Sequence, residues 1–300
     1  MSLLPVICEG TTPRFDGGAL TESLARLAPS APVAVLIHGF RYAPGNAIHC
    51  PHGHILSLTP RRDMPRAISW PRHLRLAGPQ DGLALAFGWQ ARGTIWQAQA
   101  RTAGAAAGLA ALVATIRHHD PDRRVDLVAH SLGARVALAA LPLVEAGSIG
   151  RVLLLAPADF RTHAEAAMDS GAGRAAEVFS ITSRANALFD LCMETLLSAR
   201  LHASVAQGLS HPRQNWLDLR IDDPSTEGAL ARLGFPLRPA SARICHWQPY
   251  LRPGVFALYR ALLARRIGPA QIRAALRACD PYPAAASRPD LTPAAEPVLR

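Results

Sequence analysis

A serine lies at the junction between a short apolar run and an alanine-rich segment. The run from Val125 to Ala129 leads directly into His130-Ser131-Leu132-Gly133. This strand–turn–helix context is what a nucleophile elbow needs, because the sharp turn exposes the serine hydroxyl in a strained conformation. The usual pattern is Gly-x-Ser-x-Gly, and here alanine, which is also small, takes the first position. The sequence therefore predicts Ser131 as the nucleophile of an acyl-transfer reaction.

A second motif, His38-Gly39-Phe40, follows an earlier apolar run. In acyl transfer, the oxyanion of the tetrahedral intermediate needs two preorganised N–H donors. The backbone N–H of Leu132, directly after the nucleophile, offers one donor, and that of Phe40 offers the other. Gly39 allows the chain to approach the nucleophile closely. We expect His38 to brace this loop and not to transfer protons.

With these two motifs in this order, the chain resembles the α/β-hydrolase superfamily. It is most similar to a bacterial branch with His-Gly-Phe and Ala-His-Ser-(Leu/Met)-Gly motifs. The resemblance spans roughly residues 31–263 and is specific at three points, namely these two motifs and a late histidine. It implies the α/β-hydrolase fold and a catalytic serine, acid and histidine in that chain order.

That chain order leaves four of the twelve histidines as candidates for the general base, namely His163, His202, His211 and His246. His246 stands out because it follows the last predicted strand and precedes a terminal helix that opens at Pro253-Gly254. The superfamily places its catalytic histidine there, on a loop that folds back over the nucleophile. His246 is therefore the predicted base, and the other three are expected at the surface or at a helix end.

The acid is where the sequence departs from the family pattern. Its usual position is the loop after the penultimate strand, here residues 182–187, which contains no carboxylate. In a first reading, Asn186 orients His246 by a neutral hydrogen bond, with less stabilisation of the imidazolium. In a second, Asp190 reaches the ring from one helical turn later. In a third, Asp159 serves from the end of the preceding strand. All three readings are open at this point.

The elements that must position these residues alternate between strands and helices. Continuous apolar runs, typical of strands buried on both faces, lie at residues 32–37, 83–89, 124–129, 151–155 and 177–182, and an alternating run at residues 216–221 is the candidate for a sixth strand. Helical patterns lie at residues 93–117, 133–146, 187–201, 254–265 and 269–278. This alternation predicts right-handed crossovers and an α/β fold with a doubly wound, mostly parallel sheet.

We expect a single domain over residues 1–279 and a disordered tail over residues 280–300, which are rich in Pro and Ala. Residues 41–81 form a connection where a simple turn needs only a few residues, so this insertion is expected to act as a lid. It contains His49-Cys50-Pro51-His52-Gly53-His54, whose adjacent spacing is poor for four convergent metal ligands. The sequence therefore predicts neither a metal nor a cofactor.

Composition excludes several classes of protein. Apolar residues make up 49% of the chain and charged residues 18%, which excludes a disordered chain. The net charge of +10 comes from scattered arginines without any lysine, as codon bias produces, so nucleic-acid binding is not expected. No apolar run is long enough for stable membrane insertion. Five separated cysteines and an N-terminus unlike a signal peptide favour a cytoplasmic location.

Together these features predict a serine hydrolase of the carboxylesterase or lipase kind. It would cleave a small-molecule carboxylic ester through a covalent acyl-enzyme. The missing carboxylate motivates an alternative, in which the chain is a catalytically weak hydrolase-fold protein that binds a ligand or partner through the same pocket.

Overall fold

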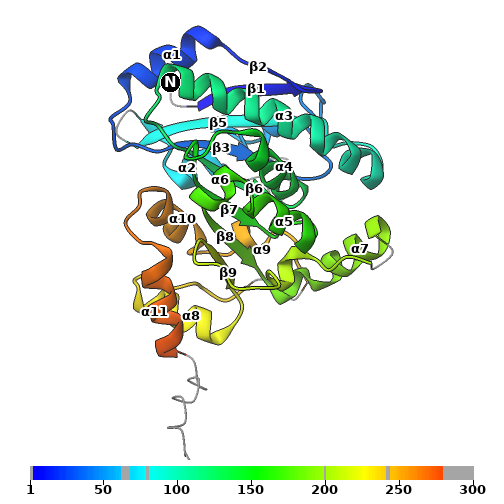
Figure 1. Cartoon of the computed structure of the whole chain (residues 1–300), viewed down its shortest axis with the longest axis vertical. Coiled ribbons are helices and arrows are strands. Elements are labelled where there is room, and N and C mark those ends of the chain that lie inside the picture. The colour runs from blue at the N-terminus through cyan, green and yellow to red at the C-terminus, as the bar shows by residue number, and fades with distance from the viewer. Residues whose placement is uncertain (1–2, 62–67, 79–80, 199–200, 241–243, 280–300) are drawn as a thin grey trace, which may run out of the picture.

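The computed structural model describes residues 3–61, 68–78, 81–198, 201–240 and 244–279. Within these residues, nine strands form one sheet in the order β2-β1-β5-β3-β6-β7-β8-β9, with β4 paired to β5 off this path (Figure 1). The strands are β1 (Leu3–Glu9), β2 (Thr12–Arg14), β3 (Val33–Ile37), β4 (Ala77–Gly78), β5 (Gly82–Trp89), β6 (Val125–His130), β7 (Ile149–Leu155), β8 (Glu177–Thr182) and β9 (Trp216–Arg220). The β1–β2 and β4–β5 pairs are antiparallel, and the other pairs are parallel.

Helices connect the strands and cover the sheet. They are α1 (Gly17–Arg26), α2 (Trp70–Leu74), α3 (Ile95–His119), α4 (Leu132–Ala140), α5 (Arg161–Met168), α6 (Gly171–Ala175), α7 (Ala187–Ser198), α8 (Pro224–Arg232), α9 (Gln248–Leu251), α10 (Val255–Leu263) and α11 (Pro269–Cys279). The 3₁₀ turns of the described residues are η1 (Pro51–Gly53), η2 (Leu141–Leu143), η3 (Arg184–Asn186) and η4 (Val205–Gln207). No helix in the described part of the chain is long and apolar enough to cross a membrane.

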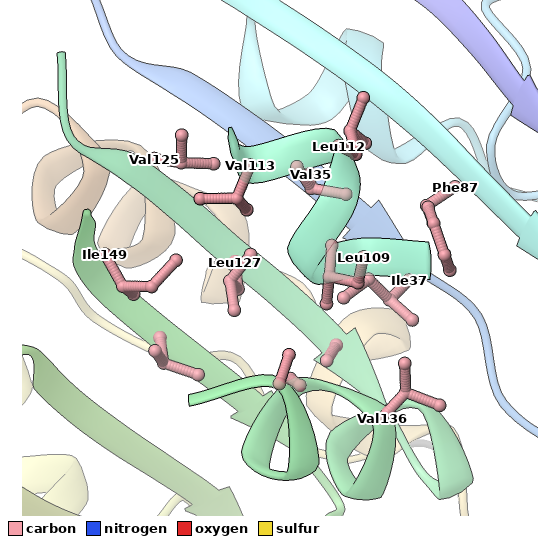
Figure 2. Packing of buried hydrophobic residues seen from close by; sticks show 14 of the residues in the cluster. Val35, Ile37, Phe87, Leu109, Leu112, Val113, Val125, Leu127, Val136 and Ile149 are labelled. Carbon is pink, nitrogen blue, oxygen red and sulfur yellow. The ribbon is translucent and has the colours of Figure 1, made fainter. Parts of the chain in front are cut away.

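Each face of the sheet carries its own apolar core. Because successive side chains of a strand point to opposite faces, Val35 of β3 packs in one core and Leu36 in the other. The first core fills the space between the sheet and the helices α3 and α4, where Val113 and Val136 meet Leu127 of β6 (Figure 2). The predicted α/β class with a mostly parallel sheet is confirmed.

The six predicted strands are all present, and the five predicted helices form within a few residues of their expected bounds. The helix predicted over 133–146 ends early, because Pro142 cannot continue it and η2 follows. The N-terminal pair of strands was not predicted. Its signal is the alternation of buried and exposed residues along β1, which is the pattern of a strand near a sheet edge.

The described parts of the 41–81 insertion contribute to the second core. Ile55, Leu56 and Trp70 are fully buried there, beside Leu36 and Ala86 of the central strands. Burying Trp70 alone removes a large apolar surface from water, so this segment helps to hold the fold together. The lid role stays a prediction. Residues 62–67, within the same insertion, and the predicted tail over 280–300 lie outside the described residues.

The order of the strands reverses at the carboxyl ends of β3 and β6. From β3 the chain moves to β5 on one side, and it then crosses back through α3 to β6 on the other. Such a reversal of strand order is where open α/β sheets bind ligands. The His38 motif follows β3 and Ser131 follows β6, so the two predicted motifs meet at this point.

Candidate active site

Ser131 occupies a strained turn between β6 and α4. Its φ of 55° lies in the left-handed region, which L-residues other than glycine rarely adopt. The turn is held by a hydrogen bond of 2.9 Å from the Ser131 N–H to the Leu155 carbonyl, and the Ser131 carbonyl accepts the N–H of Ala134 at 2.9 Å. Strain of this kind is what a nucleophile elbow uses to aim its hydroxyl out of the backbone.

Gly133 lets the first turn of α4 lie directly against the end of β3. A Cβ at this position would lie 2.5 Å from the His38 carbonyl oxygen and 2.8 Å from that of Ile37. Both obstacles are backbone atoms, which cannot rotate away. The predicted need for a small residue after the nucleophile therefore has a steric cause.

Gly133→Ala is expected to destabilise the protein by about 1–3 kcal/mol, because the added methyl must push two well-packed backbone segments apart. Urea denaturation followed by circular dichroism measures this change. Gly17→Ala is the matched control, since Gly17 begins α1 and a Cβ there meets nothing within 4 Å. Equal stability of the two variants would contradict the steric account.

His246 lies beside Ser131, on the loop before α9. Its Nε2 lies 2.7 Å from the Ser131 Oγ. Two contacts hold the loop in place: the Cys245 N–H donates to the Ala185 carbonyl at 2.9 Å, and the His130 Nε2 lies 3.2 Å from the His246 carbonyl. A serine and a histidine at hydrogen-bond distance are the minimal pair for nucleophilic catalysis by a hydroxyl.

Asn186, at the end of η3, contacts the other nitrogen of the ring. The His246 Nδ1 lies 2.5 Å from the Asn186 Oδ1, and the Asn186 Nδ2 donates to the Asp190 Oδ1 at 2.9 Å. Because the amide nitrogen can only donate, its oxygen must face the ring. His246 then carries its proton on Nδ1, and the free lone pair of Nε2 accepts the Ser131 hydroxyl proton.

The structure thus separates the three candidates for the acid. Asn186 contacts the ring of His246, and Asp190 contacts Asn186. Asp159 lies elsewhere: its buried carboxylate is bonded to Arg135 and His163, both at 2.6 Å. This arrangement does not support the reading in which Asp159 orients His246, because both carboxylate oxygens already hold a charged or ring nitrogen partner.

Burial controls the protonation of the histidines at the site. The pKa of His246 is lowered well below 6.5 by desolvation and, secondarily, by nearby His130. Burial also lowers the pKa of His130, to about 4. Both rings are therefore neutral at pH 7, which is the state that His246 needs to accept a proton.

The pKa of Asp190 is shifted upward, whereas those of the two histidines are shifted downward. Burial raises its pKa to about 7, and the charge of Glu194 adds to the effect, whereas the hydrogen bond from Asn186 opposes it. The carboxylate behind Asn186 therefore changes charge close to neutral pH, which ordinary aspartates do not.

The two predicted oxyanion donors flank the serine. Leu132 is the first residue of α4, and the Gly39–Phe40 turn is so close that a Cβ on Gly39 would lie 2.7 Å from the Ser131 Cβ. In the described part of the chain, neither the Leu132 nor the Phe40 N–H donates to a backbone carbonyl. A helix N-terminus and an unused loop amide suit a developing negative charge.

Three other histidines, His38, His52 and His54, make contacts that support the fold. The Nε2 of buried His38 accepts the N–H of Trp89 at 3.0 Å, so its predicted bracing role is confirmed. His52 contacts the Ala86 carbonyl at 2.9 Å, and His54 contacts the Tyr42 hydroxyl at 2.7 Å. In the described residues, no group of three or more His, Cys, Asp or Glu side chains is placed to hold a metal ion.

His130 is a site residue that sequence reasoning missed. Its ring is buried between Tyr250, at a centroid distance of 5.0 Å, and Trp70, at 6.3 Å. From this position it contacts the backbone of His246 and so helps to fix the loop that carries the predicted base. The sequence could have indicated this role, because His130 directly precedes Ser131 at the end of a buried strand, where its side chain has to pack against the surrounding structure.

Comparison with known proteins adds a family similarity. Residues 94–217 match the family described as T6SS Tle3 phospholipase effector domain. The match covers less than half of the chain and includes Ser131, Asn186 and Asp190, whereas Phe40 and His246 lie outside it. No curated protein matched the chain. The similarity is to a lipase-like hydrolase family, and it suggests hydrolysis of lipid esters.

Proposed function

We propose that the protein is a serine hydrolase of the α/β-hydrolase fold that cleaves carboxylic ester bonds of phospholipids. The observation that carries this proposal is the line of hydrogen bonds from Ser131 through His246 to Asn186, built on a serine with a φ of 55°. A serine in an ordinary turn needs neither this strain nor a neutral imidazole at 2.7 Å.

In the proposed mechanism, the Ser131 Oγ attacks the ester carbonyl carbon while the His246 Nε2 takes the hydroxyl proton. The carbonyl oxygen becomes an oxyanion, which the N–H groups of Phe40 and Leu132 stabilise. When the tetrahedral intermediate collapses, the C–O bond to the alcohol breaks and the imidazolium returns its proton to the leaving oxygen. Water then attacks the acyl-enzyme by the same route and releases the fatty acid and free serine.

Asn186 supports this chemistry differently from a carboxylate. It holds the tautomer and orientation of His246, but its neutral oxygen stabilises the imidazolium less than a negative charge does. Asp190 supplies a negative charge that is one hydrogen bond further from the His246 ring. It accepts the Asn186 amide N–H and so polarises the amide. The arrangement predicts an active enzyme with a modest rate.

The phospholipid part of the proposal is supported by the family similarity over residues 94–217. The net charge of +10 is consistent with it, since a positive field attracts an anionic substrate. Carboxylic ester hydrolysis in general is supported by the geometry alone.

A fluorophosphonate probe tests the mechanism. We expect the wild-type protein to be labelled once, with the probe mapped to Ser131 by peptide mass spectrometry, and prior denaturation in urea to abolish labelling. Fatty-acid release from phosphatidylglycerol in mixed micelles tests the substrate class. A label on another residue, or no label on the native protein, would refute the proposed mechanism.

A second candidate function is ligand binding without turnover. It is favoured by the amide at the position where the family pattern expects a carboxylate. The distinguishing measurement is the turnover of p-nitrophenyl esters by the wild-type protein and by Ser131→Ala. Equal rates over a broad panel of esters would favour the binding protein.

A further inference from the structure

Helix α7 has its apolar and polar sides reversed with respect to a normal surface helix. Leu188, Leu191 and Leu196 face solvent with 52%, 43% and 50% of their surface exposed. Surface helices of globular proteins ordinarily turn such residues toward the core and their charges outward. Figure 1 shows α7 at the periphery of the molecule, reaching away from the sheet.

The carboxylates of α7 point inward and are occupied. The Asp190 Oδ1 accepts the Asn186 amide at 2.9 Å. The Glu194 Oε1 accepts the Ser204 N–H at 2.6 Å and the Gln207 amide at 2.8 Å. Asp190 and Glu194 are the only charged residues of the helix, so its outward face carries no charge. These inward bonds fix the rotation of α7 and thereby hold the leucines outward.

The exposed apolar surface extends beyond α7 at both ends. At its C-terminal end, Trp96 is 55% exposed and its indole N–H donates to the Leu196 carbonyl at 2.8 Å. At its N-terminal end, Ile244 is 64% exposed, next to the Cys245 N–H that binds the Ala185 carbonyl. We call Leu188, Phe189, Leu191, Leu196, Trp96 and Ile244 the α7 apolar surface. Contiguous exposed apolar residues of this kind mark interaction sites.

This surface is continuous with the candidate active site. The ring of Phe189 stacks on that of His246, with 4.9 Å between centroids and 27° between planes. Whatever covers α7 therefore lies beside the proposed base. A partner that is also the source of the substrate would deliver it directly to Ser131.

Positive charge flanks the apolar residues. Arg184 and Arg220, both exposed, line a cavity of about 390 Å³ together with Leu191 and the inward carboxylates of α7. The Arg184 guanidinium also lies 3.8 Å from the Asp223 carboxylate, but 67% of its side chain stays exposed to solvent. An apolar face edged by arginine guanidinium groups complements a bilayer, where acyl chains lie beneath anionic phosphates. A purely apolar protein groove would not use the flanking charge.

We infer that the α7 apolar surface docks onto the surface of an anionic phospholipid bilayer and places the Ser131–His246 pair at the lipid headgroups. The leucines, Trp96 and Ile244 enter the boundary between headgroups and acyl chains, and Arg184 and Arg220 contact lipid phosphates. This inference rests on the proposed function for its substrate, but its test measures binding without hydrolysis.

The test is flotation of the protein with vesicles in a density gradient, in a Ser131→Ala background that cannot hydrolyse the lipid. Vesicles contain equal parts of phosphatidylcholine and phosphatidylglycerol, or phosphatidylcholine alone. The test variant is Leu188→Gln/Leu196→Gln. The matched control is Leu143→Gln, because Leu143 is 55% exposed but lies on η2, away from α7.

We expect the Ser131→Ala protein to float with the anionic vesicles, more strongly than with phosphatidylcholine alone and less strongly at high salt. Leu188→Gln/Leu196→Gln should lower the partition coefficient at least about tenfold, while Leu143→Gln leaves it unchanged. With an intact Ser131, the double variant should keep its turnover of a soluble short-chain ester within about twofold, which shows that it folds.

Three outcomes would overturn the inference. The first is no flotation of the Ser131→Ala protein, and the second is equal flotation of the two leucine variants. The third is a concentration-dependent dimer that Leu188→Gln/Leu196→Gln dissolves without any flotation, since α7 would then be a contact between two copies of the chain. Flotation through α7 without fatty-acid release would refute the proposed function alone, and ester turnover without flotation would refute the docking surface alone.

Discussion

Replacing Ser131 by alanine is expected to lower kcat for ester hydrolysis by about 10⁴- to 10⁶-fold, because no other hydroxyl lies within reach of the His246 Nε2 in the described structure. The remaining rate would come from the oxyanion donors and substrate binding alone. His246→Ala should cost a similar factor, and the double variant hardly more, because the two side chains act as a unit. Steady-state assays with a chromogenic ester measure all three rates.

Ser30→Ala is the control for this substitution, since Ser30 lies in an exposed turn between α1 and β3. It should match the wild type in turnover and in fluorophosphonate labelling. The free energies of unfolding of the two serine variants, measured by urea denaturation, should agree to within about 0.5 kcal/mol. A Ser131→Ala protein that folds and keeps its full ester turnover would refute the serine mechanism.

Exchanging the amide and the carboxylate behind His246 is expected to make a faster enzyme. In Asn186→Asp/Asp190→Asn, a carboxylate contacts the Nδ1 of His246 and an amide lies behind it. Loss of such a carboxylate costs a related triad about 10⁴ in kcat, so gaining one should raise kcat by roughly ten- to a hundredfold in a site not shaped for it. The measurement is kcat/KM from about pH 4 to pH 9.

The same exchange should move the acid limb of the profile. Burial keeps the pKa of His246 well below 6.5 in the wild type, and no carboxylate among the described residues contacts its ring. A negative charge at Nδ1 favours the imidazolium and raises this pKa. Because the protonated ring cannot act as a base, the exchanged enzyme should lose activity at a higher pH than the wild type does.

The single variants divide the effect. In Asn186→Asp alone, two carboxylates would face each other across a contact that is now 2.9 Å, so they would share one proton and the gain in kcat should be smaller.

In Asp190→Asn alone, the charge behind the Asn186 amide disappears. Since the pKa of Asp190 is about 7, wild-type kcat should rise as pH increases through that value, and Asp190→Asn should lack this rise. Identical profiles for all variants would show that Asn186 does not support the base.

Local patterns sufficed to predict the strands and the reactive pair. A parallel strand buried on both faces is nearly continuously apolar, so β3, β5, β6, β7 and β8 can be predicted from the sequence. Ser131 and His246 follow from motifs because each depends on its immediate neighbours: a small residue in the turn, or a loop just before a helix. Their 2.7 Å contact agrees with that prediction.

The choice among Asn186, Asp190 and Asp159 needed the tertiary structure. Asn186 and Asp190 are four residues apart, so a helical turn brings them together, but which of them faces His246 depends on the rotation of η3 and α7 against a loop about sixty residues later. Asp159, in the loop between β7 and α5, forms an ion pair with Arg135 of α4. No local pattern contains these long-range partners.

The sequence by itself predicted the α/β alternation and singled out Ser131 and His246, the proposed nucleophile and base, because these depend on short-range periodicity and turn chemistry. Only the tertiary structure decided how α7 is turned. Helical periodicity separates Leu188 and Leu196 from Asp190 and Glu194, but it does not say which side meets the protein. The amide and backbone groups of Asn186, Ser204 and Gln207 take the carboxylates inward, and this hydrogen bonding leaves the leucines facing outward.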